Sequence, residues 1–231
     1  MIVFKESPLV LTDGAIETQS GQTLREIYSL YAAIAKRFNL PMQLGTQDPR
    51  AVPLVRDVAL SSGARIVIAG VMVPSSNDYR EQAAALASAG VDFLYAQMFP
   101  SVDELQEAAR AMSATQLPFV VAPMPPLATA IARLDDDAAA RPWHYMLVCL
   151  SPADAATALE SLFRSAPALA HRVVGLQANG SPDYPEQFAR EIWECAQTFG
   201  LHVLGGCHGT NARHIEAIAE ISRRNEASGT V

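Results

Sequence analysis

A thiol and an imidazole lie next to each other near the C-terminal end of the chain, at Cys207 and His208. An apolar run that ends in Gly205 and Gly206 precedes the pair, and Gly209 follows it. Glycine lets the backbone pass close to a ligand or to a neighbouring strand. Cysteine thiolate and neutral imidazole are the side chains that bind zinc most readily. The segment therefore indicates a metal site or a nucleophile.

Short apolar runs alternate with helical patterns along the chain. The runs are nearly continuous and often β-branched, which is typical of parallel strands buried on both faces. They cover residues 9–11, 42–44, 65–69, 92–95, 119–121, 146–149, 173–176 and 202–204. Eight strands, each followed by a helix, predict a compact (β/α)8 TIM barrel of the α/β class, with one domain over residues 1–231. A doubly wound open sheet is the alternative.

Helix signals support this alternation. Residues 23–37 carry one apolar stripe at spacings of three and four. Asp78 has the side chain of an N-cap, and Ser101 with Glu104 forms a capping-box pattern. The least regular stretch is 123–137, which contains prolines and an acidic run. We interpret that stretch as a solvated connection or a lid.

In such barrels the chemistry lies where the strands end. This rule selects polar and sulfur-bearing side chains that directly follow the predicted strands. The residues at these strand ends are Asp13, Gly14, Glu17, Thr46, Gln47, Asp48, residues 72–75, Gln97, Met98, Met124, Cys149, Ser151, Ala178, Asn179, Cys207 and His208. The remaining histidines at 144, 171 and 202 precede strands, so we expect them on the opposite face, without a catalytic role.

Composition restricts the partners of the protein. Half of the residues are hydrophobic and 18% are charged, which is typical of a globular chain with a core. A net charge of −7 and a pI near 5.2 argue against a surface for nucleic acid. Three cysteines form no disulfide framework, and neither a signal peptide nor a membrane-spanning run is visible. We expect a cytoplasmic protein that binds neither membranes nor nucleic acid; its oligomeric state is open.

Five segments, in order, resemble the homocysteine S-methyltransferase family, including the betaine and S-methylmethionine enzymes. The first is similar to the family's Asp-Gly-Gly-Met-Gly-Thr, and the last to its Gly-Gly-Cys-Cys-Gly-Thr followed by His-Ile. The segments are DGAIET at 13–18, DYREQ to AGVDFL at 78–94, the stretch from PS at 100–101 to LP at 117–118, VGLQAN at 174–179, and GGCHGT at 205–210 with HI at 214–215.

The resemblance implies a (β/α)8 barrel that transfers a methyl group from a small donor to a thiol such as homocysteine. It implies zinc on three cysteines, one at the end of strand seven and two at the end of strand eight. Zinc lowers the pKa of the substrate thiol, so that a thiolate attacks the methyl group. Acidic residues after strands one and four hold the substrate's amino group. The substrate-binding residues implied here are Asp13, Gly14, Ala15, Glu17, Thr18, Gln97 and Asn179.

The sequence departs from the family at several of these positions. Ala178 replaces the cysteine of strand seven, His208 replaces the second cysteine of the pair, and Gln97 replaces the glutamate of strand four. Glu17 stands where the family has glycine, and it would restore the lost negative charge if its side chain reached the pocket.

Three hypotheses remain for the site. In the first, Cys207 and His208 hold zinc with a third ligand, Cys149 or Asn179. In the second, the metal is lost and Cys207 with His208 carries out other chemistry. In the third, both are packing remnants in a barrel that binds a small molecule or has no catalytic activity. Cys149 has two interpretations of its own, as a third ligand or as a small hydrophobic core residue.

Overall fold

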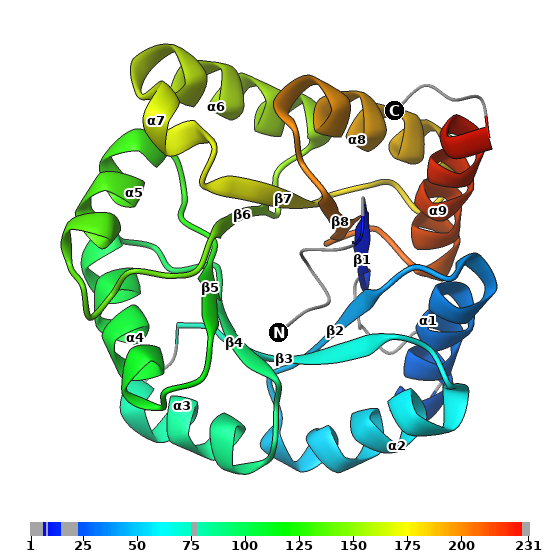
Figure 1. Cartoon of the computed structure of the whole chain (residues 1–231), viewed down its shortest axis with the longest axis horizontal. Helices are drawn as coiled ribbons and strands as arrows, with labels where there is room; N and C mark the ends of the chain where they lie inside the picture. The colour runs from blue at the N-terminus through cyan, green and yellow to red at the C-terminus, as the bar shows by residue number, and fades with distance from the viewer. Residues whose placement is uncertain (1–6, 8, 15–22, 75–77, 228–231) are drawn as a thin grey trace.

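In the computed structural model, which describes residues 7, 9–14, 23–74 and 78–227, eight parallel strands close into a barrel. Figure 1 looks down this barrel, with the strands in the middle and the helices in a ring around them. The strands are β1 (Val10–Thr12), β2 (Met42–Thr46), β3 (Ile66–Met72), β4 (Phe93–Ala96), β5 (Phe119–Val121), β6 (Tyr145–Val148), β7 (Val173–Ala178) and β8 (Val203–Gly206).

The helices of the outer ring connect consecutive strands, except for the last helix, which follows β8 (Figure 1). They are α1 (Leu24–Phe38), α2 (Val52–Ser62), α3 (Tyr79–Ser88), α4 (Val102–Ala114), α5 (Leu127–Asp136), α6 (Pro152–Ser165), α7 (Pro167–Ala170), α8 (Pro185–Phe199) and α9 (Ala212–Ala227), with a 3-10 turn η1 (Pro49–Ala51) before α2. The predicted single-domain (β/α)8 barrel is confirmed.

The pairing of β1 with β8 closes the sheet. Val10 lies opposite Val203 and Leu11 lies opposite Leu204, so the first and last strands are hydrogen-bonded neighbours. This pairing excludes the doubly wound open sheet, in which both edge strands stay unpaired. Closure leaves none of the eight strands at an open edge of the sheet.

Two apolar layers fill the molecule. Alternate strand residues point inward and form a small core inside the barrel, which contains Phe93, Tyr95, Val120, Met146 and Val148. The other strand residues point outward and pack against the apolar stripes of the helices in a much larger core. Continuous apolar strands are required because both faces of the sheet are buried.

The helix starts predicted from the sequence are confirmed. Thr23 and Glu26 form a reciprocal capping box at the start of α1. The side chain of Asp78 accepts a hydrogen bond from the backbone N–H of Arg80, and that of Ser101 accepts one from the backbone N–H of Glu104. These caps satisfy backbone donors that would otherwise have no partner at a helix start.

The interpretation of 123–137 as an irregular connection or lid is wrong. The helix α5 occupies most of this stretch and begins directly after Pro126. Its buried residues Leu127, Ala130, Ile131 and Leu134 lie at spacings of three, one and three, which is one face of a helix. The prolines before the helix and the acidic residues at its end hid that pattern.

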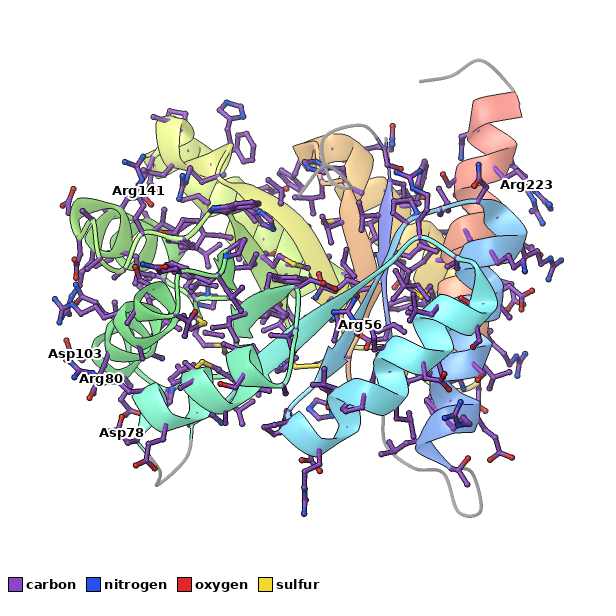
Figure 2. All side chains as sticks on the ribbon, turned by 60° about the horizontal axis from the view of Figure 1, so that its bottom comes forward. Arg56, Asp78, Arg80, Asp103, Arg141 and Arg223 are labelled. Carbon is purple, nitrogen blue, oxygen red and sulfur yellow. A yellow bond between two sulfur atoms is a disulfide. The ribbon has the colours of Figure 1, made fainter. Side chains whose placement is uncertain are left out.

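The two ends of the barrel are separate surfaces. In Figure 2, Arg141, which precedes β6, lies at the top, and Asp78 and Arg80, which follow β3, lie at the bottom. The three histidines that precede strands, at 144, 171 and 202, therefore belong to the end opposite Cys207, as predicted. None of the helices in the described ranges is long and apolar enough to cross a bilayer.

The close approach of β8 to β1 requires glycine at position 205. A Cβ atom on Gly205 would overlap the Thr12 hydroxyl and lie 2.8 Å from the Thr12 carbonyl oxygen. We therefore expect Gly205→Ala to lower the free energy of unfolding by about 2–4 kcal/mol, measured by urea denaturation. Gly90→Ala is the control, because its φ of +91° strains an alanine but no atom lies within 4 Å of the added Cβ. A control as costly as Gly205→Ala would contradict the steric explanation.

Candidate active site at the mouth of the barrel

Three side chains with metal-binding atoms converge at the strand ends. Cys149 directly follows β6, and Cys207 and His208 directly follow β8. The two sulfur atoms and one ring nitrogen of His208 all lie within 4.8 Å of one another. Both cysteines are partly buried and His208 is exposed, so the group lies at the solvent side of the strand ends. Cys207 and His208, which follow β8, thus lie close to Cys149, which follows β6.

In this structure Cys149 and Cys207 are joined by a disulfide, with Cα atoms 5.6 Å apart. That separation lies in the ordinary range for disulfides. The expectation that the cysteines stay unpaired is therefore wrong for these two, because the sheet brings together residues 58 positions apart in the sequence. Reduction of this bond gives two thiols beside the imidazole of His208.

The backbone that carries Cys149 is unusual. Its φ of 57° lies in the left-handed region, which is uncommon for a residue with a side chain. Two hydrogen bonds hold it there: its N–H donates to the carbonyl oxygen of Gln177 at 3.0 Å, and its carbonyl oxygen accepts from the side-chain amide of Asn179 at 2.8 Å. Residues held in this way concentrate at functional sites. Both partners lie at the end of β7, between the two cysteines.

Ala178 has a different environment from that of a metal ligand. It is fully buried in the outer core, on the side of the sheet that faces the helices. Its carbonyl oxygen accepts a hydrogen bond of 2.7 Å from the N–H of Cys207. The sulfur atom that lies near Cys207 therefore belongs to Cys149 at the end of β6, and β7 supplies none at position 178. Cys195 is buried within α8, and burial raises the pKa of its thiol to about 11.

His214 holds the loops around the site. It is fully buried near the start of α9. Its Nε2 lies 2.9 Å from the carbonyl oxygen of Ser181, and its Nδ1 accepts from the N–H of Asn211 at 3.2 Å. Burial lowers the pKa of His214, so the ring is neutral and donates from Nε2 to Ser181. The His-Ile segment of the resemblance is thus structural here, because it joins the loop after β7 to α9.

A cavity of about 490 Å³ opens beside the cysteines. This volume is typical of a pocket for a small metabolite. Its walls come from the ends of the strands and from the start of α1. The lining includes Asp13, Gly14, Gln43, Thr46, Val71, Tyr95, Gln97, Met98, Gln177, Cys149, Cys207 and His208.

Asp13 is the buried acid of this cavity. Only 4% of its surface is exposed, and its Oδ2 accepts a hydrogen bond of 2.7 Å from the N–H of Gly45. Burial raises the pKa of Asp13 to about 7. Among the residues that the structure describes, no lysine or arginine lines the cavity. A buried carboxylate without a cation is costly, so Asp13 favours a positively charged ligand.

The phenol groups near Asp13 stay protonated. Burial, and then the charge of Asp13, raises the pKa values of Tyr28, Tyr31 and Tyr95. The hydroxyl of Tyr28 donates to the carbonyl oxygen of Gly45 at 2.8 Å. The surroundings of Asp13 are therefore polar but neutral.

The predicted substrate-binding residues separate into three groups. Asp13, Gly14 and Gln97 line the cavity. Asn179 is absent from the described lining and instead holds the carbonyl group of Cys149. Ala15, Glu17 and Thr18 lie outside the described residues, and with them the idea that Glu17 compensates for the charge lost at Gln97.

Sequence reasoning missed Tyr95 and Gln177. Tyr95 is 1% exposed and Gln177 is 7% exposed, and both line the cavity. The signal for Tyr95 was the alternation along β4, which places Phe93 and Tyr95 on the inner face. Gln177 was a polar residue inside an otherwise apolar strand, and such residues need a partner or a function.

A comparison of the sequence with models of protein families covers nearly the whole barrel. The family model for homocysteine S-methyltransferase matches residues 11–222, which include every described residue of the site. The chain belongs to the homocysteine S-methyltransferase family. No curated protein sequence matches the chain.

Solved structures of other proteins share the barrel. A chitinase domain from Pyrococcus furiosus matches with a TM-score of 0.61 and 11% identity, over 94% of this chain and 96% of that chain. Octameric ribulose-1,5-bisphosphate carboxylase/oxygenase from Pyrococcus horikoshii OT3 matches with a TM-score of 0.57 and 13% identity, over 99% of this chain and 61% of that one. At these identities the likeness concerns the fold alone, since one fold serves many functions.

The raised pKa of Asp13 predicts a pH-dependent stability. Between pH 4 and about 7 the unfolded chain releases this proton while the folded chain retains it, so the free energy of unfolding falls as the pH rises and levels off above 7. Asparagine does not ionise, so in Asp13→Asn this decrease in the free energy of unfolding with rising pH is absent. We expect the variant to gain on the order of 2–4 kcal/mol relative to the wild type between pH 5 and pH 8, measured by urea unfolding. An equal difference between the two proteins at both pH values would contradict the assignment.

Proposed function

We propose that this chain transfers a methyl group from a small methyl donor to a thiol such as homocysteine, with zinc held by Cys149, Cys207 and His208. The observation that carries the proposal is the convergence of these three side chains beside a cavity that contains a buried acid. Membership of the homocysteine S-methyltransferase family supports the reaction class. The thiol and the methyl donor are the small-molecule partners.

The donor set fits zinc. Two thiolates and one imidazole are a known ligand set for catalytic zinc, and a fourth position stays open for a substrate. The disulfide between Cys149 and Cys207 must first be reduced, because the thiolate is the form that binds metal. A reducing compartment such as the cytoplasm would keep the two cysteines as thiols. When bound, zinc supplies a lower pKa for the substrate thiol.

The chain's own residues position the substrate. Asp13 is the group that would hold the ammonium of an amino acid, because it is buried and lacks a described cation. Binding a cation would lower the pKa of Asp13 and keep it ionised. The backbone at Gly14 lies beside Asp13 in the lining, where it would face the substrate's carboxylate. Cys207 and His208 line the same cavity, where they would hold the thiol.

A second candidate is a divergent family member without zinc that binds or transforms another small metabolite. The disulfide of Cys149 with Cys207 favours this candidate, since a disulfide offers no thiolate to a metal. Replacement of family ligands by Ala178 and Gln97 favours it too. The two candidates differ in one measurable property, the zinc content of the reduced protein.

Zinc content tests the proposal. After reduction with a phosphine, we expect about one zinc per chain by elemental analysis. Cys149→Ser and Cys207→Ser should each lower the affinity for zinc at least about tenfold, because each removes one of three ligands. Methyl transfer to homocysteine should fall with it. Cys195→Ala is the matched control: this cysteine is buried in α8, away from the site, so zinc content should stay unchanged.

Reduced wild-type protein that binds no zinc, while still binding a small metabolite, would establish the second candidate instead. A control variant that loses zinc together with the two serine variants would show that metal binding depends only on the fold.

A further inference from the structure

We propose that Cys149 and Cys207 form a redox-active pair that exchanges with small neutral thiols and disulfides in the cavity, and that Asn179 is the positioning residue of this pair. The proposal goes beyond both candidate functions, because it needs neither zinc nor a methyl donor. The observation behind it is a disulfide whose two cysteines line the wall of a cavity of the size that suits a small metabolite.

The disulfide is accessible from the cavity. Cys149 and Cys207 are both partly exposed, and both belong to the cavity lining. Exposed disulfides are the labile and catalytic ones, whereas structural disulfides resist reduction by small thiols. The third cysteine of the chain, Cys195, is buried within α8 and is absent from the described lining. A small thiol that enters the cavity therefore meets the sulfur atoms of Cys149 and Cys207.

The end of β7 fixes the separation of the two cysteines. The N–H of Cys149 donates to the carbonyl oxygen of Gln177 at 3.0 Å, and the N–H of Cys207 donates to that of Ala178 at 2.7 Å. Because these carbonyl groups belong to consecutive residues, one strand end holds both cysteines. Neither bond involves a sulfur atom, so both can persist when the disulfide opens. The two thiols then stay side by side, and their high effective concentration favours renewed closure.

Asn179 completes this arrangement at a cost to the fold. Its Nδ2 donates to the carbonyl oxygen of Cys149 at 2.8 Å, while its Oδ1 is buried without a hydrogen-bond partner in the described part of the chain. An unsatisfied buried oxygen lowers stability. The backbone that Asn179 holds is itself unfavourable, because Cys149 has a φ of 57°. Unfavourable features that coincide in this way indicate a function for the position of Cys149.

The charged groups of the cavity favour a neutral thiol over an anionic one. Asp13 and Asp48 belong to the lining, and no lysine or arginine among the described residues does. An anionic thiol would bring a further carboxylate close to these acidic groups, where like charges repel. A neutral thiol of similar length avoids this repulsion.

The exchange balances without a further reactant. A small thiolate, whose proton has passed to water, attacks one sulfur of the pair. The bond between Cys149 and Cys207 breaks, and the other cysteine leaves as a thiolate that takes up a proton. A second small thiolate then attacks the small-molecule sulfur of the mixed disulfide, which releases a small disulfide and the second cysteine thiol. Two electrons pass to the protein, and the reverse sequence reduces another small disulfide and restores the pair.

Reduction kinetics test whether the cavity binds the thiol. Oxidised protein is mixed with 2-mercaptoethanol in the presence of a chelator, and the thiols that form are alkylated and counted by mass spectrometry. We expect the rate to saturate with thiol concentration, because the thiol binds before it reacts. At equal thiolate concentration, 3-mercaptopropionate should react at least about tenfold more slowly, because of its charge. A rate that rises linearly and equally with both thiols would show an ordinary disulfide only and would overturn the proposal.

Turnover tests the pair itself. Catalytic amounts of wild-type protein should accelerate the reduction of 2-hydroxyethyl disulfide by dithiothreitol, whereas Cys149→Ser and Cys207→Ser should each abolish the acceleration. Cys195→Ala is the control and should react like the wild type, because this cysteine is buried within α8. Turnover that survives in both serine variants would contradict the assignment to this pair.

Asn179→Ala tests the positioning role. We expect it to lower the equilibrium constant for closing the protein disulfide, measured against dithiothreitol, at least about fivefold, since one hydrogen bond to Cys149 is lost. Asn225→Ala is the matched control, because its Nδ2 also donates to a backbone carbonyl oxygen, that of Ile221 at 2.9 Å, within α9. Its disulfide equilibrium should equal that of the wild type. Equal equilibrium constants in Asn179→Ala and the control would remove Asn179 from the proposal.

The outcomes separate this proposal from the zinc proposal. Saturable exchange and turnover by a protein that binds no zinc after reduction would uphold the redox-active pair and defeat zinc-dependent methyl transfer. Zinc binding and methyl transfer, together with linear reduction and no turnover, would uphold the proposed function and defeat the pair.

Discussion

Closure of the sheet is the constraint on which the site depends. The register of β1 against β8 sets the last strand beside the first, so that Asp13 and Cys207 open into one cavity although they lie at opposite ends of the sequence. Gly206 donates its N–H to the carbonyl oxygen of Asp13 at 3.2 Å, directly at this junction. The pairing also requires glycine on β8, because Thr12 occupies the space of a side chain at 205. Strand packing thus explains Gly205, whereas a side chain at Gly206 would overlap that of Thr210 in the loop before α9.

The cavity combines groups that are unfavourable in the folded protein alone. A carboxylate is buried without a described cation, and two side chains in the wall of the same cavity, Tyr95 and Gln177, each have a buried oxygen atom without a hydrogen-bond partner among the described residues. Each feature lowers stability, and each would be relieved by a ligand that brings a positive charge and N–H donors. The apolar core between barrel and helices is continuous, so the fold tolerates these local costs. Unfavourable groups gathered in one pocket are typical of a binding site.

The two cysteines show how side chains from neighbouring strands meet at the mouth of a barrel. Position 178 packs toward the helices, whereas Cys149 on the neighbouring strand reaches Cys207 through a left-handed backbone held by Gln177 and Asn179. All strand ends of a parallel barrel meet at one surface, so a side chain that is absent at the end of one strand can have a counterpart at the end of the next. The same proximity allows the two sulfurs to bond to each other when oxidised.

The sequence alone determined the barrel, its strand order, most helix starts and the positions of Asp13, Cys207 and His208, because apolar periodicity and caps are local signals. It missed α5, where prolines obscured a helical stripe, and it left the role of Cys149 open. Only the tertiary structure decided that Cys149 meets Cys207, that Asn179 holds a backbone turn, and that Tyr95 and Gln177 keep unpaired atoms at the cavity. These facts depend on side-chain direction and on contacts between residues far apart in the chain. No local pattern in the sequence encodes either of them.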